Sequence, residues 1–180
     1  MLQYSASYLW QTVIVIIIGV VLAGCASPKM VSSLTFVDPN FKRCVVAQGK
    51  QKIKQITTLD CRHFNIRDAR EIRYLTYLKR LDLSSNQLTN LNISHNHQLQ
   101  LISVEHNKLS TLDLSDNPQL QIINISFNRL KTINVSDNPL LMYLNYDATL
   151  IKDVDIKHNP RLLAPFYTID VPNGPTIMAE

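Results

Sequence analysis

The chain has 180 residues and a formal net charge of +4, with 46% hydrophobic and 18% charged residues. It contains only four glycines and no P-loop, GxGxxG or GxSxG pattern, so the common phosphate-binding and nucleophile motifs are excluded. The length suits a single folded domain.

Residues 1–24 have the pattern of a secretory signal, because a short apolar run at 13–22 ends in small residues before a cysteine. The tetrapeptide LAGC at 22–25 resembles the lipobox of bacterial lipoproteins. That resemblance implies cleavage before Cys25, a diacylglycerol on its sulfur and an N-acyl chain such as palmitate. No Lys or Arg precedes the apolar run, which departs from the usual signal. A retained inner-membrane anchor is the alternative, although such a run is short for a spanning helix of about 20 residues.

Cleavage after residue 24 of 180 leaves 156 residues. Ala26, in place of Asp, resembles lipoproteins that are sent to the outer membrane, facing the periplasm or the surface. Inner-membrane anchoring with the domain in the periplasm is the alternative. Residues 25–35 lack periodicity and are expected to be a lipidated tether. Apart from the lipid on Cys25, no cofactor is expected.

Residues 36–77 are expected to form an N-terminal cap that includes a first strand. Asp38 followed by Pro39 is a good helix start and Gly49 a plausible stop, which predicts a helix over 39–48. Residues 56–66 fit a degenerate form of the repeat described below, and residues 67–77 have apolar side chains at helical spacing. A cap is required because the first turn of a repeat stack otherwise exposes its apolar face.

The chain has three cysteines, Cys25, Cys44 and Cys61. If Cys25 carries lipid, the other two are left in an oxidising compartment, which favours a Cys44–Cys61 disulfide. Such a bond would join the cap helix to the first strand and contribute roughly 3 kcal/mol by the chain-entropy estimate. Two free buried thiols are the alternative, and the spacing does not match a redox-active CxxC pair.

From residue 78 to 162 one phrase recurs: apolar, two variable, apolar, one variable, apolar, two variable, asparagine. It begins at positions 78, 88, 99, 109, 120, 130, 141 and 151, so the starts alternate by 10 and 11 and the full period is 21. Thr149 alone replaces the asparagine. Apolar and polar residues alternate within each copy, which is typical of a strand with one buried face.

This pattern resembles the short bacterial form of the leucine-rich repeat family. Half a period is too short to close a coil, so each 21-residue period is expected to make one turn. The resulting interpretation is a mostly β solenoid of about four turns, with two short strands per turn and an α-helical N-terminal cap.

The asparagines fall into two columns. Their inward amides are expected to satisfy backbone groups where strands end, as scaffold and not as metal ligands. The columns are Asn86, Asn107 and Asn128 in the first halves, and Asn96, Asn117, Asn138 and Asn159 in the second halves.

The outward positions of the first halves are the expected partner-binding face. Leu101, Ile122 and Tyr143 should lie one above the other on a sheet that faces water, and an exposed apolar patch of this kind marks an interaction site. The complete predicted face is Arg80, Leu101, Glu105, Ile122, Asn124, Phe127, Tyr143 and Asn145. Ser84 and Ser126 are expected to point outward in the column of Glu105. Cover by the chain's own C-terminal arm and homodimerisation are the alternatives, so the oligomeric state stays open.

Residues 163–180 break the phrase and are expected to form a last strand or arm over the C-terminal edge, with a loose tail from Pro172.

Charge is uneven along the chain: residues 29–80 hold 12 Lys and Arg against 4 Asp and Glu, and residues 81–180 hold 6 against 10. The basic cap therefore lies next to the lipid and could contact anionic head groups. The basic residues of interest are Lys50, Lys52, Lys54, Arg67, Arg70 and Arg73.

The five histidines have no zinc-site spacing and no catalytic constellation is present, so no metal and no enzymatic activity are expected. By resemblance, the function is protein recognition or assembly in the cell envelope; secreted internalin-like members bind host receptors. The alternatives are glycan or peptidoglycan binding, for which few aromatic side chains are available, and a purely structural subunit of a secretion or surface complex. The export signal argues against nucleic acid as a partner.

Overall fold

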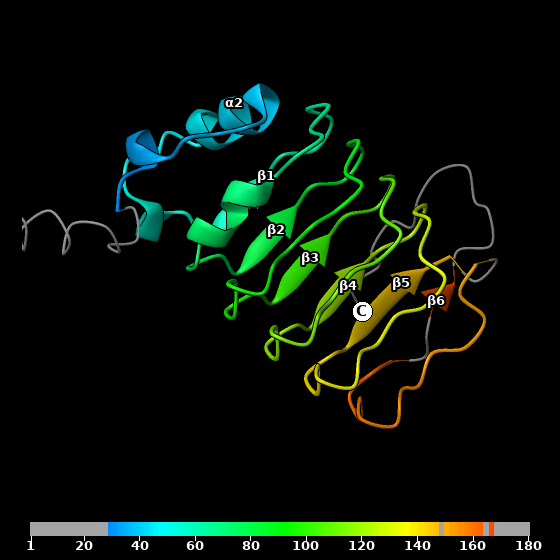
Figure 1. Ribbon diagram of the computed structural model, residues 1–180. Helices are drawn as coiled ribbons and strands as arrows, with labels where there is room; N and C mark the ends of the chain where they lie inside the picture. The colour runs from blue at the N-terminus through cyan, green and yellow to red at the C-terminus, as the bar shows by residue number, and fades with distance from the viewer. Residues whose placement is uncertain (1–28, 148–149, 164–165, 168–180) are drawn as a thin grey trace, which may run out of the picture.

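The computed structural model describes residues 29–147, 150–163 and 166–167. The chain winds as a solenoid, and one side of the solenoid is a parallel sheet of six strands. The strands follow one another in space in their sequence order, β1-β2-β3-β4-β5-β6 (Figure 1). The strands are β1 Thr58–Asp60, β2 Arg80–Asp82, β3 Leu101–Ser103, β4 Ile122–Asn124, β5 Tyr143–Tyr146 and β6 Phe166–Tyr167. The predicted fold of about four turns with a 21-residue period is confirmed.

The repeat phrase builds the sheet through the two-residue period of a strand. In β2 the side chain of Leu81 points into the core and is fully buried, whereas its neighbours Arg80 and Asp82 lie on the outer face. The next turns place Ile102 and Ile123 in register with Leu81. Burial of this continuous apolar column holds the turns together, since no single turn could bury its own apolar side chains.

The prediction of two strands per turn is wrong, because the described second halves contain no strand. Their backbone is bonded locally. The Oδ1 atom of Asn92 accepts a hydrogen bond from the N–H of Ser94 at 2.9 Å, and Asp113 does the same for Ser115 at 3.0 Å. Asn134 and Asp155 repeat the bond in the following turns. The first halves make the same Asx bond, as from the N–H of Ser84 to Asp82, but they are also bonded from turn to turn, as from the N–H of Leu83 to the carbonyl of Ser103 at 2.8 Å.

The N-terminal cap contains α2 Pro39–Ala47, and three 3-10 helices, η1 Val31–Ser33, η2 Ile53–Gln55 and η3 Arg70–Tyr74. The predicted α-helix is confirmed. The helical spacing at 67–77 gives only η3. Phe41, Cys44 and Val45 of α2 are fully buried, so the helix covers the open end of the solenoid.

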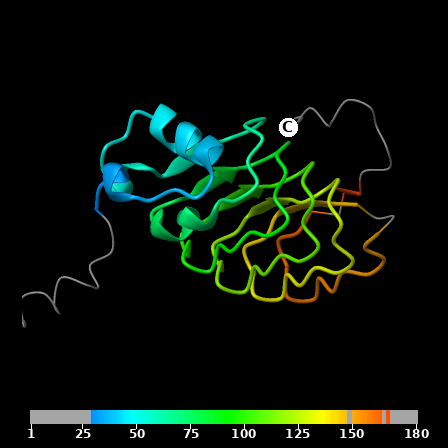
Figure 2. The ribbon, with the colours of Figure 1, turned by 45° about the horizontal axis from the view of Figure 1, so that its top comes forward.

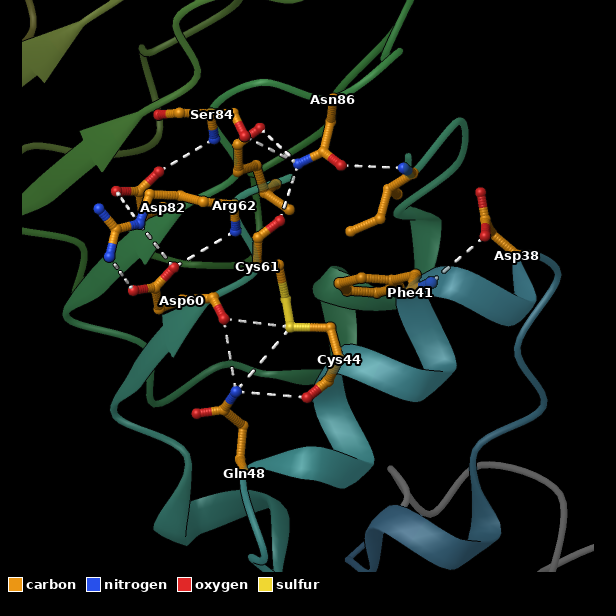
Figure 3. The surroundings of a disulfide bond; sticks show 12 residues. Asp38, Phe41, Cys44, Gln48, Asp60, Cys61, Arg62, Asp82, Ser84 and Asn86 are labelled. Atoms are coloured by element: carbon orange, nitrogen blue, oxygen red, sulfur yellow. Dashed lines mark hydrogen bonds and ion pairs between the residues drawn. A yellow bond between two sulfur atoms is a disulfide. The ribbon is translucent and has the colours of Figure 1, made fainter. Parts of the chain in front are cut away.

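The Cys44–Cys61 disulfide is present and fixes α2 to the chain just after β1 (Figure 3). Asp38 ties the other end of the helix. Its Oδ1 accepts from the backbone N–H groups of Asn40 and Phe41, and its Oδ2 accepts from those of Arg67 and Asp68. The cap is therefore attached to the first turn at both ends of α2.

The folded domain begins earlier than the predicted tether at 25–35 allows. Met30 forms an antiparallel bridge with Lys52, and the N–H of Val31 donates to the carbonyl of Gln51 at 2.8 Å. Val31 and Leu34 are buried in the core. Residues from 29 onward thus belong to the cap, because the apolar side chains of this segment pack into its core.

At the other end, β6 pairs in parallel with β5, with Asn145 opposite Phe166 and Tyr146 opposite Tyr167. The predicted last strand is confirmed as an extension of the sheet edge, and the predicted tail from Pro172 lies outside the described residues. No helix in the described part of the chain is long and apolar enough to span a membrane.

Candidate functional site

The outer face of the sheet carries an apolar stripe, which we define as Leu101, Ile122 and Tyr143. Strand register places these three residues directly beside one another, with Arg80 next in line on β2. Ile122 is 37% exposed, and Leu101 and Tyr143 are half-buried. The period of 21 residues therefore brings together the column that the sequence predicted, on β2 to β5 of Figure 1.

A polar ladder lies beside the stripe, one strand position nearer the turn. Its members are stacked in register: Asp60, Asp82, Ser103, Asn124 and Asn145. The guanidinium of Arg62 is 2.7 Å from Asp60 and 3.6 Å from Asp82 (Figure 3). The hydrogen bond from Arg62 lowers the pKa of Asp60, so this carboxylate stays charged.

The ladder continues toward the C-terminal end through amides. The side chain of Asn124 donates to the Glu105 carboxylate at 2.6 Å, and the side chain of Asn145 donates to Asn124 at 3.2 Å. Burial, and to a smaller extent the charge of Glu105, raises the pKa of the Tyr143 phenol. These bonds fix the polar side chains next to the stripe in one arrangement.

Asn145 is only 2% exposed, so its prediction as a partner-facing residue is wrong. Ser84 and Ser126, expected to point outward, are buried as well. The Ser84 hydroxyl lies 2.8 Å from that of Ser103, and the Ser126 hydroxyl donates to Asn124 at 2.9 Å. The chain turns inward directly after each strand, which closes these positions from solvent.

Phe127 lies on this turn and not on the stripe. Its ring stacks on His106 of the preceding turn, with centroids 4.2 Å apart and planes 6° from parallel. Both residues have a positive φ, at 54° and 52°. Ser85 and His63 occupy the same register position with φ of 55° and 61°. This left-handed column was not predicted from the sequence, although the position directly before each first-half asparagine was a signal for such a turn.

The two asparagine columns bond the backbone differently. Asn107 donates to the carbonyls of Leu83 and Val104, and its Oδ1 accepts from the N–H of Leu88 at 2.9 Å. Asn117 donates to the carbonyls of two residues in the preceding turn, but its Oδ1 has no partner. The same two patterns recur in Asn86 and Asn128, and in Asn96, Asn138 and Asn159.

Within the described ranges, no three His, Cys, Asp or Glu side chains are grouped closely enough to hold a metal ion. The predicted lipid site Cys25 lies outside these ranges. The described surface combines an apolar stripe, a fixed polar ladder and a stacked aromatic pair.

No protein-family model matches the chain, and no curated protein is similar to it. Among solved structures, it is similar to the functional domain of InlJ from Listeria monocytogenes, which includes a cysteine ladder. Sequence identity is 33% and the TM-score 0.66, over 71% of this chain and 30% of that one. An internalin, InlF, from L. monocytogenes strain 4b F2365 has 19% identity and a TM-score of 0.58, over 77% of this chain and 51% of its own.

The chain thus spans less than two thirds of either structure. The three cysteines of this chain all precede the repeats at 78–162, so it has no cysteine column there. The columns that run through its repeats are of asparagine. The solenoid fold and the 21-residue turn agree with these neighbours. The described domain is a leucine-rich repeat solenoid, and its structural neighbours are internalin leucine-rich repeat proteins.

Proposed function

We propose that the chain is a lipid-anchored protein of the bacterial cell envelope that recognises a protein partner through the outer face of its sheet. The apolar stripe is the observation that carries this proposal. Leu101, Ile122 and Tyr143 form one continuous column on a face bounded by charged and amide side chains. An apolar centre with a polar rim is the composition of a protein interface.

Rigidity supports binding by this face. The backbones under the stripe are hydrogen-bonded from turn to turn, as in the bond from the N–H of Ile122 to the carbonyl of Gln100 at 3.1 Å. The polar ladder beside it is bonded side chain to side chain. A surface that is already ordered loses little conformational entropy when a partner docks, so a small apolar area is used efficiently. Exposed Arg80 and half-buried Glu105 supply opposite charges at the rim.

A photo-crosslinking amino acid placed at Ile122 tests the binding face in cells. We expect a discrete adduct with one envelope protein. The matched control carries the same group at Thr132, which is exposed on the opposite flank of a neighbouring half-turn. Leu101→Glu, added to the protein that carries the crosslinking amino acid at position 122, should abolish the adduct while the circular dichroism spectrum stays unchanged. Equal adducts from both positions, or none from position 122, contradict the proposal; an adduct with a second copy of the chain indicates self-association.

The envelope part of the proposal rests on the LAGC tetrapeptide that ends at Cys25. Mass spectrometry of the membrane-extracted protein should show an N-terminal Cys25 carrying a diacylglycerol and an N-acyl chain. Cys25→Ser should remove these masses and release no mature form. Separation of inner from outer membranes then locates the protein, and outer-membrane recovery is expected because Ala26 follows the cysteine. An unmodified Cys25 would disprove the anchor but not the binding face.

A further inference from the structure

We propose that one face of the cap rests on the anionic head groups of the membrane that holds Cys25. This basal face consists of residues 29–34, Val46 and residues 49–54. The inference rests on the proposed lipid anchor and deepens it, because it states how the domain meets the lipid surface. The folded chain begins at this end of the molecule, as Figure 2 shows.

The length of chain between anchor and fold limits how far this face can move from the lipid. Lys29 is four Cα–Cα steps of about 3.8 Å from Cys25, so its maximum reach is about 15 Å. Lys29 is already part of the fold, since its carbonyl accepts from the N–H of Ile53 at 3.1 Å. The adjacent bridge between Met30 and Lys52 attaches the lysine-containing segment to the same point.

The basal face has the charge that suits such a surface. Lys50, Lys52 and Lys54 are exposed and form no ion pair with a described residue. Exposed Lys29 and Lys42 add to them. The only acidic residue between positions 29 and 57 is Asp38. Each basic residue near an anionic surface strengthens attraction about five-fold, provided that it lies within a screening length of about 8–10 Å.

Two of the arginines that the sequence grouped with these lysines are engaged elsewhere. The guanidinium of Arg70 is 2.5 Å from the carboxylate of Asp68, and that of Arg73 lies 4.8 Å from the ring centre of Tyr74. Lys50, Lys52 and Lys54 have no such partner among the described residues, and the bridge between Met30 and Lys52 holds their segment beside the start of the fold.

A partly apolar groove lies beside Lys50. Half of its lining residues are apolar: Met30, Val31, Leu34, Phe36 and Val46; Lys42 and Lys50 line it too, with Ser32, Gly49 and Gln51. Val46 is 53% exposed although it is on the cap helix. Apolar side chains surrounded by lysine are the combination that binds the boundary between head groups and acyl chains. Both the charge and the apolar side chains of the basal face therefore favour contact with lipid.

Tryptophan fluorescence tests the contact. The lipidated protein with Val46→Trp is reconstituted into vesicles of phosphatidylglycerol and brominated phosphatidylcholine. Trp10 is the chain's only tryptophan and precedes the cleavage site, so the new residue reports alone. We expect a blue-shifted emission that the bromine atoms quench. The matched control is Leu163→Trp, which replaces a 63% exposed side chain in the last described turn and should stay unquenched.

The role of charge is tested by Lys50→Gln, Lys52→Gln and Lys54→Gln together in the Val46→Trp protein. The docked-to-undocked ratio should fall by about two orders of magnitude, at about five-fold per lysine. Substituting Lys131, Lys152 and Lys157 in the same way should change nothing. If position 46 is no more quenched than position 163, or if the three substitutions have no effect, the basal face does not dock. An unlipidated Cys25 overturns the anchor and this inference together.

Discussion

At the scale of single residues, the turn after each strand contains a backbone conformation that most side chains avoid. Ser85, His106 and Phe127 all have φ near +50° to +55°. A residue with a Cβ in the left-handed region costs roughly 1–2 kcal/mol, which glycine does not incur. Backbone bonds to the next turn offset this cost at two of them: the N–H of Ser85 donates to the carbonyl of Glu105 at 2.9 Å, and that of His106 to the carbonyl of Ser126 at 3.1 Å.

Ser85→Gly should therefore stabilise the domain. The backbone hydrogen bond is kept and the left-handed strain is relieved, so we expect the free energy of unfolding to rise by about 0.5–1 kcal/mol in urea denaturation. Ser110→Gly is the matched control, since Ser110 is exposed and does not have a positive φ. Ser110→Gly should lower the free energy of unfolding by roughly 0.5–1 kcal/mol. Two substitutions with the same sign would contradict this account of the turn.

Asp38 makes stability depend on pH. Burial raises the pKa of its carboxyl, but the four backbone N–H donors together outweigh burial and lower the pKa below the ordinary 3.8. Because the folded pKa is below the unfolded one, the carboxylate contributes its full stability above pH 3.8 and loses it as pH falls through the lowered value.

Asp38→Asn should cost about 1–3 kcal/mol at pH 7, because an amide N–H₂ replaces the oxygen that accepts from Arg67 and Asp68. The difference in unfolding free energy from wild type should narrow below pH 3.8. Chemical denaturation of both proteins at pH 7 and pH 3 measures it. A constant difference across that range would show that the charge of Asp38 plays no part.

At the scale of elements, the two asparagine columns should differ in energetic weight. Asn107→Ala leaves the buried N–H of Leu88 without a partner, whereas the carbonyls of Leu83 and Val104 still accept from Asn86 and Asn128. Asn117→Ala removes one of two donors from the carbonyls of Ile93 and Asn96, which still accept from backbone N–H groups, and it also removes an unpartnered Oδ1. An orphaned buried N–H is rarer and more costly than an under-satisfied carbonyl. Asn107→Ala should therefore lower the unfolding free energy by about 1–2 kcal/mol more than Asn117→Ala, as thermal and urea unfolding can measure.

The elements that the sequence predicted well are those decided by periodicity and caps. Alternation around Leu81 required a strand, and Asp38 with Pro39 required a helix start. The second halves carry the same alternation yet form no strand, and their Asx bonds do not explain this, since Asp82 of β2 bonds the N–H of Ser84 in the same way. Apolar spacing alone does not distinguish a strand from an extended segment held by side chains.

The candidate site could be predicted in part for the same reason. A fixed 21-residue period places Leu101, Ile122 and Tyr143 in one column whatever the shape of the turn, so their adjacency followed from counting. The burial of Asn145 did not, because it depends on how far the chain turns inward after β5. The stacking of His106 on Phe127 likewise depends on a left-handed turn that composition does not indicate.

At the scale of the whole molecule, stability is distributed along a stack in which each turn contacts only its neighbours. A central turn is packed on both sides, whereas a terminal turn is packed mainly on one. Ile123 of β4 is fully buried between β3 and β5, and Ile151 is 2% exposed in the last described turn. The two residues are the same type and equally buried, so they form a matched pair for testing position in the stack.

Ile123→Ala should lower the free energy of global unfolding by about 2–5 kcal/mol, because the cavity disturbs turns on both sides. Ile151→Ala should instead let the last turn open locally, since the rest of the stack keeps its own contacts. Amide hydrogen exchange distinguishes these outcomes: protection should fall throughout β2 to β5 in the first variant and only near residues 141–163 in the second. Uniform loss of protection in both would mean that the solenoid unfolds as one unit, with the cap and the last strand as strongly coupled as neighbouring turns.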